Sequence, residues 1–237
     1  MASGFSWTNA RKVRLKADAT HVCWLTGVTY ACCLVLLCGL SISAQPSAPA
    51  GAAAVADAIV WGLPMAPAAQ TSDLPRNVQQ RLADYRQRER LFRSALTPPP
   101  GATAVEHELF DKRVAIERVL FCLFPRKDIG RVAAGYASDA DVSYEWEGAS
   151  DPPRREAAFI DGLLRDLQQP WLAPYLDLIA GHRKLCASQL QGGESEANRA
   201  AIAGAGRRQI ARARDGGHPL IRVAAEHLLA AGRCVER

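Results

Sequence analysis

The stretch Asp151–Leu190 constrains the fold most, because it holds two helical patterns with almost no linker between them. In the first pattern, apolar residues recur at the spacing of one helix face: Phe159, Ile160, Leu163, Leu164 and Leu167. Pro170 ends this pattern, because a proline disfavours the α conformation in the residue before it. The second pattern starts at Trp171. So short a connection predicts two antiparallel helices that pack side by side.

The rest of the chain after residue 71 repeats this helical character, and strand signals are nearly absent. Thr103 and Glu106 have the spacing of a capping box before an apolar run. Gly204 and Gly206 interrupt an Ala-rich segment and predict a weak helix there. We therefore expect an all-α domain over residues 72–237. Its architecture should be an irregular bundle of five or six helices built on antiparallel pairs, after an N-terminal signal or anchor segment.

The N-terminal segment 1–44 has the pattern of a targeting sequence. A basic stretch, Arg11–Lys16, precedes the apolar run Val22–Leu40, and Ile42–Ala44 offers a small-residue cleavage site. The run is long enough to remain as an uncleaved membrane anchor instead. In either case the basic flank predicts that the rest of the chain is exported: periplasmic, extracellular or held at the inner membrane. Residues 45–71 are rich in Ala and Pro and predict a linker, within which Val55–Trp61 is apolar enough to dock on the body.

Charge gives no support for nucleic-acid binding. The formal net charge is +5, but four of the 29 basic residues and one of the 24 acidic residues precede residue 45, so the remainder is nearly neutral. The basic face within residues 76–93 could rest on anionic lipid, although a solvated helix face explains the same pattern.

Four of the seven cysteines fall in the targeting segment, which leaves Cys122, Cys186 and Cys234 in the body. An exported chain with three cysteines predicts one disulfide and one leftover thiol. We expect Cys186 to pair with Cys234, because both lie late on C-terminal helices. Cys122 lies in an apolar run and should be a buried small hydrophobe. Three free thiols are the alternative.

The same cysteines belong to a possible metal site. His182 and Cys186 are four residues apart and share one helix face, and His227 and Cys234 could face them. Two His and two Cys are ligand types that suit zinc, but their spacing matches no recognised zinc pattern. A Cys186–Cys234 disulfide would exclude the site, so we expect no metal and no cofactor.

Carboxylates give the remaining enzyme hypothesis. Glu145 and Glu147, with Asp177 and His182, could line a cleft as the paired acids of a hydrolase do. The acidic loop that holds the two glutamates fails as a calcium loop, because Tyr144 occupies the position of the turn glycine. No nucleophile elbow or phosphate loop is present in the sequence.

These observations favour a domain that acts by binding or scaffolding, with a protein or envelope partner and no catalysis. The alternative is a small periplasmic metal-binding protein or hydrolase that uses the His182, Cys186, Glu145 and Glu147 region. The sequence encodes neither the ligand nor the oligomeric state, and no family pattern covers the chain.

Overall fold

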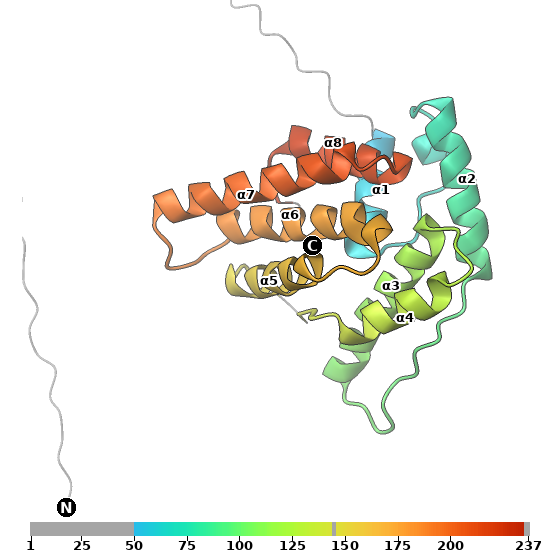
Figure 1. Cartoon of the computed structure of the whole chain (residues 1–237), viewed down its shortest axis with the longest axis horizontal. Helices are drawn as coiled ribbons and strands as arrows, with labels where there is room; N and C mark the ends of the chain where they lie inside the picture. The colour runs from blue at the N-terminus through green and yellow to red at the C-terminus, as the bar shows by residue number, and fades with distance from the viewer. Residues whose placement is uncertain (1–49, 144–145, 235–237) are drawn as a thin grey trace, which may run out of the picture. The chain divides into compact units, whose positions relative to one another are not determined.

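The computed structural model describes residues 50–143 and 146–234, and this part of the chain is helical without a named strand (Figure 1). The described residues form eight α-helices, more than the five or six expected, and two short 3-10 helices. The helices are α1 (Ala50–Trp61), η1 (Ala68–Thr71), α2 (Arg76–Leu91), α3 (Ala104–Leu123), α4 (Ile129–Asp139), α5 (Asp151–Arg165), η2 (Pro170–Leu172), α6 (Ala173–Gln189), α7 (Glu196–Asp215) and α8 (Pro219–Ala231).

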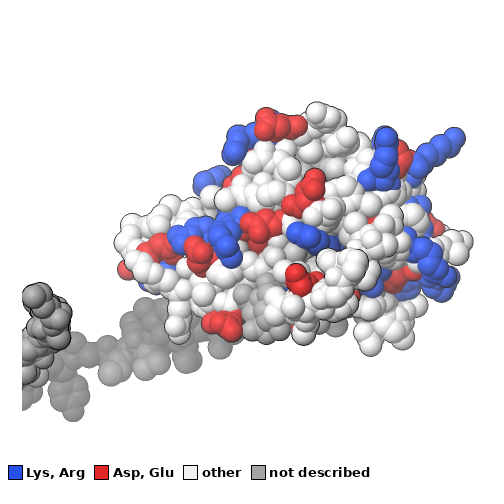
Figure 2. Space-filling view, turned by 90° about the horizontal axis from the view of Figure 1, so that it is seen from below, with Lys and Arg blue, Asp and Glu red and all other residues white. Residues whose placement is uncertain are grey.

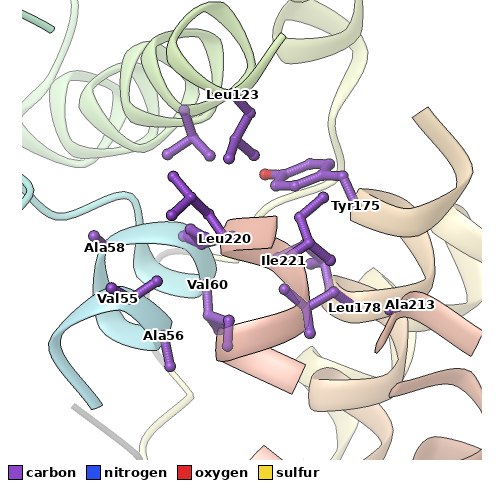
Figure 3. Packing of buried hydrophobic residues seen from close by; sticks show 14 of the residues in the cluster. Val55, Ala56, Ala58, Val60, Leu123, Tyr175, Leu178, Ala213, Leu220 and Ile221 are labelled. Atoms are coloured by element: carbon purple, nitrogen blue, oxygen red, sulfur yellow. The ribbon is translucent and has the colours of Figure 1, made fainter. Parts of the chain in front are cut away.

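Helix α1 corrects the expectation of a linker over residues 45–71. Val55 and Ile59 are fully buried, and α1 packs against α8, whose Leu220 and Ile221 belong to the same buried cluster (Figure 3). Alanine-rich composition suggested a linker, but alanine is also the best helix former and lets helices pack closely. Helix α1 is therefore part of the core, whereas Pro67–Gln70 after it are exposed.

Helix α6 is the centre of the domain. Almost every side chain from Tyr175 to Ser188 is buried, because α5, α7 and α8 all pack against this helix. Figure 1 shows α5, α6 and α7 side by side, which agrees with the expected pairing of the helices in Asp151–Leu190. Charged and polar side chains are rarely buried unless they are paired, yet α6 buries Asp177, His182 and Arg183. These three residues are therefore candidates for a function or a structural pair.

Two glycines let α6 and α7 approach closely. A Cβ atom on Gly206 of α7 would lie 2.7 Å from the carbonyl oxygen of Gly181 in α6, and a Cβ atom on Gly181 would lie 2.8 Å from the carbonyl oxygen of Gly206. The sequence suggested that Gly206 only weakens its helix. In the structure, the lack of a side chain at Gly206 is instead needed for packing. Its missing side chain allows the backbones of α6 and α7 to approach each other closely.

The capping box predicted at the start of α3 is present, since Thr103 Oγ1 accepts from the Glu106 amide and the Glu106 carboxylate accepts from the Thr103 amide.

The basic face of α2 is partly buried against the rest of the domain. Arg86 donates to the Ala66 carbonyl, and Arg88 donates to carbonyls at the end of α3, where helical partners are missing. These two arginines are structural, which weakens the lipid hypothesis.

The charged surface is mixed. Lys and Arg lie among Asp and Glu on the face in Figure 2, without one continuous field of either sign. No helix among the described residues is both long and apolar enough to cross a membrane. The expected signal or anchor segment, residues 1–44, lies outside the described residues.

Candidate functional site

The disulfide expected between Cys186 and Cys234 is present. Cys186 of α6 and Cys234, just beyond the end of α8, are joined with their Cα atoms 4.6 Å apart. Cys122 is the free, buried cysteine of the described body, as expected, and burial raises the pKa of its thiol to about 12. The bond ties the centre of the domain to its C-terminal end.

His182 lies directly beside this disulfide. It is fully buried, and its Nε2 atom lies 3.6 Å from the Sγ atom of Cys186. Its Nδ1 atom lies 2.9 Å from an Nη atom of Arg183, and its ring meets the Trp61 ring edge-on with centroids 5.2 Å apart. Because a guanidinium can only donate, Nδ1 must accept, and the ring proton of the neutral imidazole lies on Nε2.

Only three of the four candidate metal ligands lie together among the described residues. His182, Cys186 and Cys234 offer donor atoms within 4.8 Å of one another. His227 lies elsewhere, in a groove between α8 and the start of α2. A ligating histidine normally donates its second ring N–H to an acceptor, whereas Nδ1 of His182 faces a cationic donor. The geometry therefore favours the disulfide over a metal at this position.

Arg183 is the hub of the buried polar cluster. Its Nε atom donates to Glu156 of α5 at 2.7 Å, and both side chains are almost fully buried. Its guanidinium lies 4.6 Å from the Trp61 ring centroid and 5.2 Å from that of Trp146. Glu156 also accepts from the Ser143 amide at 2.9 Å and from Trp146 Nε1 at 3.3 Å. Every strong donor here has a partner, so the cluster fixes α1, α5 and α6 against one another.

The sequence did not predict this cluster, since neither Arg183 nor Glu156 belongs to any of the motifs found in it. One signal was available: Glu156 lies one helical turn before Phe159 and Ile160 and so shares the face of the apolar pattern. An acid at such a position predicts a buried pair, but the partner comes from another helix.

The cavity beside the cluster is small. It has a volume of about 100 Å³ and is lined by Trp61, Trp146, Glu156, Tyr175 and Arg183 among others. Burial raises the pKa of Tyr175, so its hydroxyl is neutral at physiological pH. This volume admits a few water molecules but not a drug-sized ligand, which needs about 300 Å³ or more.

The carboxylate hypothesis receives no geometric support. Glu145 lies outside the described residues, and Glu147 is exposed on a turn with φ of 48°. Asp177 is paired with Arg212 of α7 through two hydrogen bonds of 2.6 and 3.3 Å. His182 is enclosed by Arg183 and the disulfide. The described candidates therefore do not converge in one cleft as paired acids of a hydrolase must.

A larger groove lies between α2, the end of α3 and the turn from α7 to α8. We call it the His218 groove. Its volume is about 580 Å³, within the range of small-molecule sites. The rings of Phe124 and Trp171 lie 4.9 Å apart at their centroids, and those of Phe124 and His218 lie 5.4 Å apart. Other lining residues are Arg81, Tyr85, Arg88, Cys122, Pro125, Pro170, Pro174 and Pro219.

Two buried polar atoms among the groove's lining residues lack hydrogen-bond partners. His218 Nε2 donates to the Leu123 carbonyl at 3.0 Å, which leaves Nδ1 as an unpaired acceptor. Burial lowers the pKa of His218, so the ring is neutral at physiological pH. The Tyr85 hydroxyl, at 1% exposure, is also unpaired. Unpaired buried polar atoms cost about 1–3 kcal/mol each and are therefore uncommon without a function or a bound water.

Comparison with known proteins gives no relative to reason from. No family model, no curated protein and no solved structure matches the chain.

Because His182 is buried as a neutral imidazole, the free energy of unfolding should depend on pH. Burial, and next the charge of Arg183, hold the pKa of His182 well below its ordinary value in the folded chain. On acidification the unfolded state takes up a proton first. Stability is therefore fully present above about pH 6.5 and falls below it, by up to about 1.4 kcal/mol per pH unit for this group.

Urea unfolding between about pH 7 and pH 5 would measure this loss, although other groups titrate in the same range. The difference between the wild type and His182→Gln isolates the contribution of His182, since glutamine carries no titrating proton. We expect the variant to be less stable at pH 7 but to lose less stability on acidification. Equal losses in the two proteins would contradict a buried neutral His182.

Proposed function

We propose that the chain is an exported or membrane-anchored helical domain that acts by binding, without catalysis, and that the His218 groove is its binding site. The observation that carries this proposal is the groove itself, which combines aromatic walls, a proline rim and two unpaired buried polar atoms. Export rests only on the pattern of residues 1–44.

The buried cluster supports the absence of catalysis. A catalytic acid, base or nucleophile must be able to reach a substrate. Glu156, Arg183 and His182 instead bond to one another or to the backbone beside a cavity of about 100 Å³. The groove has the volume that a ligand needs, but its lining shows no pair of groups arranged as nucleophile and base.

The lining residues suggest what the groove binds. Rings of Phe124, Trp171 and His218 offer faces and edges to an aromatic or apolar body. Arg81 and Arg88 outweigh the single acid, Asp84, so a negative charge on the ligand is favoured.

Anilinonaphthalene sulfonate has these features and serves as the probe. We expect the folded full chain to bind it saturably, with at least about tenfold weaker binding in Trp171→Ala and His218→Ala. The matched control is His227→Ala, because His227 Nδ1 is also buried and unpaired but lines the other groove beside α8. Equal binding by all four proteins would overturn the assignment of the groove.

The enzyme and metal alternative has its own test. Elemental analysis of chain purified without chelator should find no stoichiometric zinc. Zinc that is lost in His182→Ala would replace the binding proposal with the metal-binding alternative.

A further inference from the structure

The connection between α2 and α3 contains an exposed proline-rich segment, residues 95–101, which we call the proline tip. Pro98, Pro99 and Pro100 are consecutive and all exposed. Figure 1 shows this connection as a loop that projects from the edge of the domain. Each proline fixes its own φ angle and biases the residue before it toward extended conformations. Residues 97–100 are therefore restricted to a polyproline II backbone, which makes no internal hydrogen bonds.

The proline tip is fixed at both ends. At its start, the buried carboxylate of Glu117 in α3 accepts a hydrogen bond from the Ala95 amide at 3.0 Å. At its end, the Ala102 amide donates to the Pro99 carbonyl at 3.2 Å, and Gly101 has φ of 72°. A proline followed by a glycine of positive φ is the pattern of a type II turn. A segment that is already fixed loses little conformational entropy when it binds a partner.

The His218 groove has the features of a site for such a segment. Polyproline II segments dock in grooves lined by aromatic rings, and this groove has Phe124, Trp171 and His218. Trp171 makes no hydrogen bond to another described residue, and its Nε1 atom is open to solvent. The Arg126 guanidinium lies 4.7 Å from the indole centroid and pairs with Asp128, which holds the ring in place. The indole N–H is therefore a free donor for a backbone carbonyl of the ligand.

Charges around the proline tip also suit the groove. The tip itself is uncharged, and its three prolines have no backbone N–H that would need a new partner on burial. Glu106 and Glu108 follow the tip at the start of α3, which matches the excess of arginine in the groove. Arg93, which precedes the tip, donates to the Phe92 carbonyl at 2.6 Å.

The proline tip cannot reach the groove of its own chain. Pro100 is three residues from Thr103, the N-cap of α3, and so lies within about 10 Å of it. The groove contains Leu123 and Phe124 at the other end of this helix. A helix of 20 residues is about 30 Å long, so the prolines stay roughly 20 Å from their own groove. The tip can therefore fill only the groove of another molecule.

We propose that the His218 groove binds polyproline II segments, and that its occupant is the proline tip of a second copy of this chain. This inference rests on the proposed binding function of the groove. The Trp171 N–H donates to the carbonyl of Thr97 or Pro98, neither of which accepts a hydrogen bond from another described residue. Because the groove and the tip are different surfaces, the contact is heterologous and joins copies head to tail.

The first experiment measures competition for the groove. Anilinonaphthalene sulfonate bound to the folded full chain is titrated with a synthetic peptide of residues 95–108. We expect saturable displacement of the dye, and at least about tenfold weaker displacement by a control peptide that carries Pro98→Ala and Pro99→Ala. Dye that leaves the groove equally with both peptides, or with neither, would overturn this inference but not the groove. Dye binding that does not depend on Trp171 would instead refute the proposed function.

The second experiment tests whether the occupant is a second copy. In sedimentation equilibrium, the average mass of the full chain should rise with concentration. Trp171→Ala alters the groove, and the double variant Pro98→Ala with Pro99→Ala alters the tip. Each alone should associate at least about tenfold more weakly than the wild type, whereas His227→Ala should match the wild type. A mixture of the groove variant and the tip variant keeps one intact groove and one intact tip. The mixture should therefore form pairs but no longer chains.

Three results would contradict a second copy as the occupant. The first is a wild-type chain that stays monomeric although the peptide displaces the dye. The second is association that persists unchanged in both variants, which would place the contact elsewhere, as in the apolar run 22–40. The third is a mixture that associates no more than either variant alone. If circular dichroism shows that Trp171→Ala does not fold, the exposed tip variant and the two peptides decide the question.

Discussion

Replacing Glu156 with alanine should destabilise the domain by about 3–5 kcal/mol, the cost of leaving a buried charge without its partner. Arg183 would keep its charge within the core but lose the 2.7 Å bond to the Glu156 carboxylate. Trp146 and the Ser143 amide would lose their acceptor as well. Urea unfolding of the full chain measures the loss as a lower midpoint.

A matched control separates burial from charge. Asp151 also pairs with an arginine, Arg154, at 2.8 Å, but both side chains are about half exposed. Asp151→Ala should therefore cost no more than about 1 kcal/mol. The double variant Glu156→Leu with Arg183→Met removes both charges and should cost less than the two single changes added together. A cost below about 1 kcal/mol for Glu156→Ala would show that the pair does not hold the helices.

Replacing Gly206 with alanine should cost roughly 2–3 kcal/mol, although alanine is the better helix former. The added Cβ atom would lie 2.7 Å from the Gly181 carbonyl oxygen and 3.1 Å from the Leu185 amide nitrogen. Both contacts are to backbone, so α6 and α7 must separate to relieve them. Because α6 is the central helix, this separation loosens the whole core.

Gly204 lies two residues away on the same helix and supplies the control. A Cβ atom there would meet only the flexible end of Arg208, at 3.4 Å. Gly204→Ala should therefore stabilise the domain by about 0.5–1 kcal/mol through helix propensity alone. If Gly206→Ala lowers the free energy of unfolding and Gly204→Ala raises it, the close approach of α6 and α7 is confirmed. Changes of the same sign in the two variants would contradict it. Thermal or urea unfolding gives both values.

Much of the helical structure was predictable from local patterns. The capping box at Thr103 and Glu106 and the two neighbouring helices of Asp151–Leu190 follow from spacing and from Pro170, and the structure confirms them. Docking of Val55–Trp61 on the body agrees with the structure, but its helix was not predicted. Its alanine-rich sequence carries little amphipathic pattern, because small residues pack on every side of a short helix.

Some features of the candidate site were predictable from the sequence and others were not. The number of cysteines and the apolar neighbours of Cys122 predicted one disulfide and one free thiol, which the structure confirms. The sequence could not tell that His227 lies apart from His182, since the packing of α7 and α8 on α6 decides that distance. Glu147, a candidate acid, is exposed, and no pattern in its loop reveals where the side chain points.

The helical class followed from the sequence alone, because helix periodicity and capping depend on neighbours in the chain. The count of cysteines favoured a Cys186–Cys234 bond but left three free thiols open, since the two residues are 48 positions apart. Export remains a prediction from residues 1–44. Only the tertiary structure decided that Arg183 bonds Glu156, that Gly181 faces Gly206 and that His218 lines a groove with Phe124 and Trp171. These contacts join residues from separate helices. Their energies depend on burial and on distances of a few ångströms, which no spacing along the chain encodes.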